Sequence, residues 1–117
     1  MKIPKLKYYY FAMNPDEYSD FQGNRTILVM PTTVIDIETG RVFARTQLLL
    51  AGSVPDADTQ FRLANKYSGR AYVLRIPAEC VDRSQLESAG DNCWHYRRSI
   101  TVAHCGIEQI DLDKTLA

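Results

Sequence analysis

Five consecutive residues carry the densest set of chemically capable side chains in the chain: Trp94, His95, Tyr96, Arg97 and Arg98. A guanidinium forks onto phosphate and an aromatic ring stacks on a base, so these residue types suit an anion or nucleotide platform. Because side chains alternate along a strand, Trp94, Tyr96 and Arg98 share one face. The same pattern fits a strand whose Trp94 and Tyr96 lie in the core while the arginines reach solvent.

A run of aromatic residues, Tyr8-Tyr9-Tyr10-Phe11, forms a second candidate. Alternation places Tyr8 and Tyr10 on one face of a strand and Tyr9 and Phe11 on the other. A strand that is buried on both sides explains this pattern. A ring-stacking ligand site that uses Tyr10 is the other interpretation.

The cysteines and histidines offer little catalytic geometry. The cysteines are Cys80, Cys93 and Cys105, an odd number without CxxC spacing, so neither a disulfide framework nor a zinc site is expected. His104 and Cys105 are adjacent and would point to opposite faces of a strand, which is poor geometry for an activated thiol. Cys80 or Cys93 could supply the thiol instead. No metal site is predicted, and the six glycines are scattered singly, so no phosphate-binding loop is formed.

Composition limits the classes of function. The chain has 117 residues, 45% hydrophobic, with 14 Lys+Arg against 14 Asp+Glu, which predicts one globular domain without net charge. A global basic field for nucleic acid is therefore excluded, and nucleic acid is not an expected partner. No stretch approaches the ~18 apolar residues of a membrane span, and the first residues lack the apolar region of a signal peptide. We expect a cytoplasmic protein with free thiols and no membrane partner.

The first helix is marked by its own start signal. Asn14 fits the N-cap, Pro15 fits the first helical turn, and Glu17 is placed to bond back to the cap. The dipeptide at 23–24 should end this helix after about two turns.

The rest of the pattern is mainly β, without the regular alternation of a doubly wound sheet. We therefore predict an α+β fold: one compact domain over residues 1–113, with a mixed, mostly antiparallel sheet, two or three short helices and a frayed tail at 114–117. Strands are predicted at 5–13, 25–37 with a break at Pro31, 41–51, 70–76, 93–98 and 106–112, a tight turn at 38–40, and helices at 56–67 and 82–89.

Several segments together resemble small bacterial and phage ADP-ribosyltransferase-like domains. Residues 9–18 (YYFAMNPDEY) are similar to the opening strand and turn of these domains. Residues 62–77 (RLANKYSGRAYVLRIP) are similar to their helix, glycine and strand that ends in "IP". Residues 94–100 and 107–112 resemble their closing strands.

This resemblance implies NAD as cofactor and an ADP-ribosyl transfer activity. NAD would lie in a cleft between the tyrosine strand and the 94–98 strand, with Glu108 as the catalytic acid that orients the ribose. The implied ligand contacts are Arg97 or Arg98 on the pyrophosphate, Tyr67 or Tyr72 on the nicotinamide, and Tyr10.

Phe11 departs from the family pattern, because these transferases usually hold NAD with an Arg or His there. A phenyl ring offers no hydrogen bond to phosphate or ribose. Two alternatives follow: an active transferase, or a degenerate site whose fold is reused for binding.

A second class of function is a small non-enzymatic inhibitor of phage or mobile-element origin, of the anti-defence type, that binds a protein target. Trp94 and Arg98 would be its partner-binding anchors. For an anionic ligand, local charge still favours one small cleft near Arg75 and Arg98, although the chain as a whole is neutral.

Overall fold

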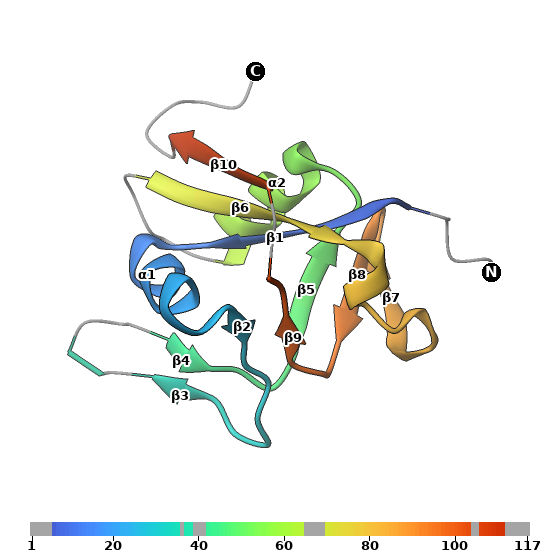
Figure 1. Cartoon of the computed structure of the whole chain (residues 1–117). Coiled ribbons are helices and arrows are strands. Elements are labelled where there is room, and N and C mark those ends of the chain that lie inside the picture. Colours follow the sequence, from blue (N-terminus) through green and yellow to red (C-terminus); the bar gives the residue numbers. More distant parts are fainter. Residues whose placement is uncertain (1–5, 36, 39–41, 65–69, 104–105, 112–117) are drawn as a thin grey trace.

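The core of the molecule is a six-stranded antiparallel sheet (Figure 1). The computed structural model describes residues 6–35, 37–38, 42–64, 70–103 and 106–111. Together with two helices, which are described in the next paragraph, this sheet confirms the predicted α+β class. The predicted tail at 114–117 lies outside the described residues. In spatial order its strands are β10 (Gly106–Asp111), β6 (Arg70–Pro77), β1 (Tyr8–Met13), β5 (Leu48–Ala51), β8 (Cys93–Tyr96) and β7 (Leu86–Gly90).

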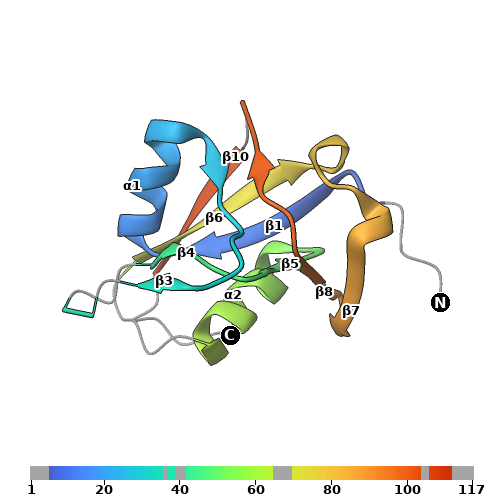
Figure 2. The same cartoon turned by 90° about the horizontal axis from the view of Figure 1, so that it is seen from below.

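Two helices cover opposite faces of this sheet. Figure 2 shows α1 (Pro15–Asn24) and α2 (Val54–Ala64) on either side of β1 and β6. Along β1, Tyr9 and Phe11 are buried in the core on the α1 side, whereas Tyr10 and Ala12 pack with the cluster on the α2 side. The strand is therefore buried on both sides, as the tyrosine run predicts.

The predicted start of α1 is confirmed. The Asn14 side chain accepts from the Glu17 N–H at 2.9 Å, and the Asn14 N–H donates back to the Glu17 carboxylate, which makes a complete capping box. The helix ends at Asn24, followed by Arg25 in the left-handed conformation at φ 57°. Phe21 carries the apolar face of the helix into the core.

Helix α2 begins two residues before the predicted position. The Ser53 hydroxyl accepts from the Asp56 N–H at 3.2 Å and donates to the Asp56 carboxylate at 2.8 Å, which satisfies the exposed end of the helix. Ala57 and Phe61, one turn apart, are buried against the sheet, as their spacing predicts. The predicted end of the helix at residue 67 lies outside the described residues.

Two predictions of secondary structure are wrong. The expected helix at 82–89 is a short 3-10 turn (Arg83–Gln85) followed by β7. Asp82 does cap this turn, by accepting from the Ser84 N–H at 3.1 Å. In the segment after Asp82, Leu86 is the buried side chain, so there is no apolar stripe that would pack a helix against the core. Pairing with β8 instead satisfies the backbone hydrogen bonds of this segment.

The expected continuous strand at 41–51 is also divided. It forms β4 (Val42–Ala44) and β5, because Arg45 leaves the first pairing and its carbonyl accepts from the Met30 N–H at 2.9 Å. The break at Pro31 is confirmed, since β2 (Thr26–Ile27) and β3 (Val34–Ile35) lie on either side of it.

Two small ribbons complete the structure. The first pairs β2 with β9 (Ile100–Thr101), a strand that the sequence pattern did not indicate. The second is the hairpin of β3 and β4, which lie on either side of the predicted turn at 38–40; residues 39–40 lie outside the described part. A further 3-10 turn covers Ala78–Cys80. Among the described helices, none has the length and apolar character needed to cross a bilayer.

Candidate functional site

A row of three paired residues crosses one end of the sheet. On β6, Arg75 lies opposite Tyr10 of β1 and also opposite Gly106 of β10. Residues directly opposite each other in an antiparallel pair share a face, so the phenol and the guanidinium lie on the same side of the sheet as α2. We call the hollow at this row the Arg75 cleft.

The Arg75 guanidinium is exposed and has no carboxylate partner among the described residues. Its central carbon lies 5.1 Å from the centre of the Tyr8 ring, a cation–π distance. Among the residues that the structure describes, no acceptor is within hydrogen-bond distance of its N–H groups. Arg45, Arg62, Arg97 and Arg98 each form an ion pair elsewhere in the structure, whereas the donors of Arg75 have no acceptor in the described part of the chain.

Gly106 makes room for this side chain. A Cβ at Gly106 would lie 2.6 Å from one terminal nitrogen of Arg75 and 2.7 Å from its Nε. Side-chain carbons do not approach so closely, since the optimum separation is about 3.5–4.0 Å. The absence of a side chain on β10 therefore lets the guanidinium lie across the strand.

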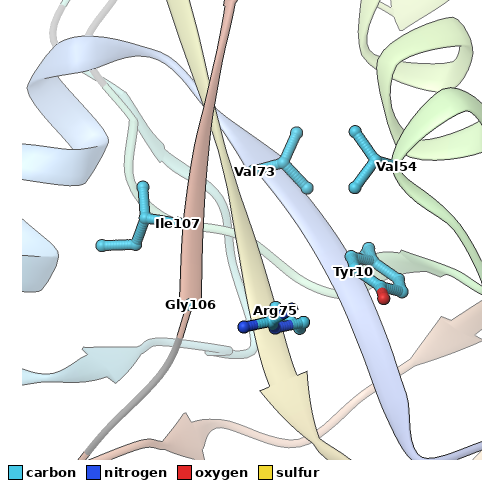
Figure 3. Close-up of a pocket in the computed structure, with 6 residues that line it drawn as sticks. All are labelled: Tyr10, Val54, Val73, Arg75, Gly106 and Ile107. Carbon is cyan, nitrogen blue, oxygen red and sulfur yellow. The ribbon is translucent and has the colours of Figure 1, made fainter.

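The walls of the Arg75 cleft are apolar. Val54, from the start of α2, and Val73 of β6 point toward each other, with Tyr10 beside them (Figure 3). Ile107 lines the cleft, but its side chain points away from these groups, so it contributes its backbone. The enclosed volume is about 160 Å³. A cavity of about 150 Å³ accepts one benzene ring, so this cleft has room for one ring-sized group.

This arrangement suits a ligand that is anionic at one point and flat or apolar beside it. A guanidinium forms paired hydrogen bonds with phosphate or carboxylate. The phenol of Tyr10 provides a ring face and a hydroxyl on the same side. The cleft is therefore built for recognition of an anion joined to a ring.

The structure separates Arg97 and Arg98 from this cleft. Arg97 pairs with Glu87 at 2.6 Å and Arg98 with Asp82 at 3.2 Å, all four side chains being largely exposed. Because β5 lies between β1 and β8, the tyrosine strand and the 94–98 strand are not neighbours; the cavity that both strands line includes His95 but neither Arg97 nor Arg98. Of the two arginines around which an anionic ligand is expected, Arg75 lies beside a cleft and Arg98 lies in an exposed ion pair.

Trp94 and Tyr72 are engaged in packing. Trp94 is 5% exposed and contacts the Tyr9 ring edge-on, with 5.6 Å between ring centres. Its burial supports the core interpretation, and leaves little of the indole for a protein partner. Tyr72 stacks on Tyr18 of α1 at 4.2 Å, on the opposite face from Tyr10. The implied role of Tyr72 on nicotinamide would require this stack to open.

The other positions of the predicted site are Tyr10, Glu108, Tyr67 and Phe11. Tyr10 lines the cleft. The Glu108 backbone pairs with Val73, a lining residue, while its side chain lies outside what the structure describes. Tyr67 is likewise outside the described residues. Phe11 is 2% exposed in the core, so the position that the family uses for an NAD contact serves packing here.

The two described cysteines, Cys80 and Cys93, form no disulfide with a described residue. Burial raises the pKa of Cys93, and the Asp56 and Asp91 carboxylates raise it further. A thiol with a raised pKa is less nucleophilic at neutral pH, which disfavours Cys93 as a catalytic group. His104 and Cys105 lie outside the described residues.

No protein-family model, curated protein or solved structure matches this chain. Within the part of the chain that the structure describes, no three His, Cys, Asp or Glu side chains are arranged to hold a metal ion. The functional argument therefore depends on the geometry of the site.

Sequence reasoning placed Tyr10 and Arg75 correctly on strands but did not find the walls of the cleft. Val54 lies in the first turn of α2, which begins earlier than the sequence pattern predicts. Gly106 contributes through its close approach to Arg75, a contact between two strands that are distant in the sequence. The sequence did contain a signal. Arg75 is a charged residue on the same face of β6 as Ala71 and Val73, which are both buried.

Proposed function

We propose that this chain binds a nucleotide of the NAD type at the Arg75 cleft. The observation that carries this proposal is a guanidinium that has no carboxylate partner among the described residues and lies between the Tyr8 ring and Gly106, beside a ring-sized pocket lined by Tyr10. A phosphate joined to a sugar and a flat ring matches both parts of the cleft. The resemblance of residues 9–18 and 62–77 to ADP-ribosyltransferase-like domains favours NAD among such ligands.

The size of the cleft defines how such a ligand would bind. About 160 Å³ admits one ring-sized group and not a whole dinucleotide. One ring would enter beside Tyr10 and Val73, and the nearby phosphate would meet Arg75. The rest of the dinucleotide would extend over the outer surface, so we expect a modest affinity.

Transfer of ADP-ribose is the second step of this proposal and depends on Glu108. Its backbone lies opposite Val73, next to the cleft lining. A carboxylate there would orient a ribose hydroxyl and stabilise the positive charge that develops as nicotinamide leaves. The burial of Phe11 supports a site that binds without the usual NAD contact on the first strand.

Thermal unfolding with NAD, AMP and adenosine tests the binding step. At ten times the dissociation constant, a ligand adds about 1.4 kcal/mol to the free energy of unfolding. We expect NAD and AMP to raise the melting temperature and adenosine, which lacks phosphate, to raise it less.

Two arginine variants provide the matched comparison. Arg75→Gln should remove the effect of AMP, and Arg97→Gln, which changes an exposed arginine on the β8 side, should keep it. Equal stabilisation by AMP and adenosine, or an Arg75→Gln variant that responds like the parent, would contradict the proposal. Release of nicotinamide from NAD, abolished by Glu108→Gln with binding intact, would establish the transfer step.

A second candidate function, docking to a protein target, is favoured by one separate observation. The segment between β2 and β4, which Figure 1 shows on the hairpin side of the molecule, exposes several large apolar side chains. Clustered apolar exposure marks interaction surfaces. The exposed residues are Leu28, Met30, Val34, Ile35 and Ile37, at 42%, 45%, 41%, 50% and 97%.

Charge insertion tests this candidate. Ile35→Asp should abolish capture of a specific partner by the immobilised chain. Leu63→Asp, a matched change at an isolated side chain on α2 that is 77% exposed, should leave capture unchanged. A partner that is retained by both variants would exclude the hairpin as the docking surface.

A further inference from the structure

A second cavity lies on the other flank of α2. Its lining comes from β1, β5, β8 and α2, whereas the Arg75 cleft uses β1, β6, β10 and the start of the same helix. Its volume is also about 160 Å³. Four polar side chains line it, Arg45, Gln47, Gln60 and His95, against apolar walls that include Leu49 and Phe61.

His95 lines this cavity and has an unsatisfied ring nitrogen. Its Nδ1 is buried and has no hydrogen-bond partner among the described residues. In the sheet His95 pairs with Leu49 on one side and Glu87 on the other. A buried polar atom without a partner is costly and is uncommon in native structures. The imidazole therefore has capacity for one hydrogen bond to a ligand.

The two glutamines also have side-chain groups that are available for hydrogen bonds. Gln47 and Gln60 are both half-buried, and neither side-chain amide has a hydrogen-bond partner within the described part of the chain. Each amide presents a donor beside an acceptor. The cavity thus combines two uncommitted amides with an uncommitted imidazole nitrogen.

The charge of this cavity is balanced within the protein. The Arg45 guanidinium forms a close ion pair with Glu17 and lies 5.1 Å from the centre of the Phe11 ring. Its positive charge is therefore already matched, in contrast to that of Arg75. A neutral ligand is favoured over an anion at this site.

The size and walls of the cavity favour a flat ring. Leu49 and Phe61 provide apolar contact, and a cavity of about 150 Å³ accepts one six-membered ring. An apolar ring would leave both amides and His95 Nδ1 unpaired. A ring whose edge carries a donor next to an acceptor would pair with a glutamine amide in two hydrogen bonds, as amides do with base edges.

We propose that this second cavity binds a neutral six-membered nitrogen heterocycle with an adjacent donor and acceptor, the chemistry of a pyrimidine base. Gln60 and Gln47 contact the edge of the ring, the His95 imidazole turns so that its Nδ1 takes the remaining hydrogen bond, and Leu49 and Phe61 contact the ring faces. The proposal does not depend on the ligand of the Arg75 cleft.

Nitrogen NMR of the histidine ring tests it with uracil as the probe. The chain has two histidines, so in a His104→Asn background the remaining imidazole signals belong to His95. Uracil should shift the Nδ1 resonance and saturate, with a dissociation constant in about the millimolar range expected of a fragment-sized ligand. Benzene, equal in size without polar atoms, and benzoate, an anion, should shift it far less at the same concentration.

Volume-conserving variants identify the contacts. Gln60→Met and Gln47→Met should each weaken uracil binding by about tenfold or more, the loss expected for one or two hydrogen bonds. Gln85→Met, at an exposed glutamine on the 3-10 turn Arg83–Gln85, and Arg75→Gln should leave it unchanged. The amide spectrum of each variant verifies that it is folded, and the two independent glutamines keep the test valid if one variant unfolds.

Four results would overturn the proposal. Benzene binding as well as uracil would show an apolar cavity only, and stronger binding of benzoate would show an anion site. Uracil binding that survives both glutamine changes, or that leaves the His95 resonance unmoved, would place the ligand elsewhere. Loss of the NAD response in Arg75→Gln with uracil binding retained would separate the two sites.

Discussion

The contact between Gly106 and Arg75 gives the sharpest test of the Arg75 cleft. In Gly106→Ala, the new Cβ would lie 2.6 Å, 2.7 Å and 2.9 Å from three atoms of the guanidinium, whereas carbon contacts are comfortable at about 3.5–4.0 Å. The guanidinium must therefore move by about 1 Å. A hydrogen bond at 2.7–3.2 Å does not survive such a shift without the ligand moving too.

The stability of this variant should change little. The atoms that must move are the far end of an exposed, flexible side chain, and replacing glycine in a strand removes about 0.5–1 kcal/mol of unfolded-state entropy. We expect the free energy of unfolding to stay within about 1 kcal/mol of the parent. Binding should weaken more, because a hydrogen bond to a charged group contributes about 1.5–3 kcal/mol, or about 10- to 100-fold in affinity.

Calorimetric titration with AMP, together with denaturant unfolding, separates the two effects. Gly23→Ala is the matched control, because a Cβ at Gly23 meets nothing within 4 Å. It should bind AMP like the parent. If Gly106→Ala binds AMP normally while Arg75→Gln does not, the position of the guanidinium across β10 is not what recognises the ligand. An unfolding loss above about 2 kcal/mol would show that Gly106 supports the fold instead.

Three further predictions concern the fold. Asn14→Ala removes the capping box and should lower the free energy of unfolding by about 1 kcal/mol in urea denaturation; no change would mean that Glu17 alone caps the helix. Trp94→Ala should cost about 3–5 kcal/mol in the same assay, because the indole is 5% exposed; a cost below about 1 kcal/mol would contradict its place in the core. Burial raises the pKa of Glu17 above its ordinary value of 4.5 despite Arg45, so the folded state binds this proton more tightly than the unfolded chain. The contribution of Glu17 to the free energy of unfolding should therefore fall as pH rises from about 4.5 through the raised pKa. Urea unfolding of the parent and of Glu17→Gln at several pH values should show the parent losing stability relative to the variant over this range. A parent that gains stability relative to the variant would refute this sign.

Local signals in the sequence predicted the local structure well. The spacing of Asn14, Pro15 and Glu17 contains the entire capping box, since all its atoms come from four consecutive residues. The alternation at Tyr8–Met13 and Arg70–Pro77 predicted both strands and their buried faces. These features depend only on neighbours within one turn or one pleat.

The candidate site was predictable only in part. Tyr10 and Arg75 could be placed on strands, but the strand order decided that they are neighbours and that Arg97 and Arg98 are not. The expected helix at 82–89 failed for a related reason. Its residues permit either structure, and the free edge of β8 supplies the hydrogen bonds that favour a strand.

The sequence by itself determined the α+β class, the caps, the two-sided burial of the tyrosine strand and the absence of net charge. Only the tertiary structure decided which charges are paired: it gives Arg97 and Arg98 nearby carboxylates and places Arg75 beside Gly106, with no carboxylate partner in the described part of the chain. The physical reason is that ion pairs and cavities depend on which distant strands meet. That pairing is selected by the packing of the whole core, and no local pattern encodes it.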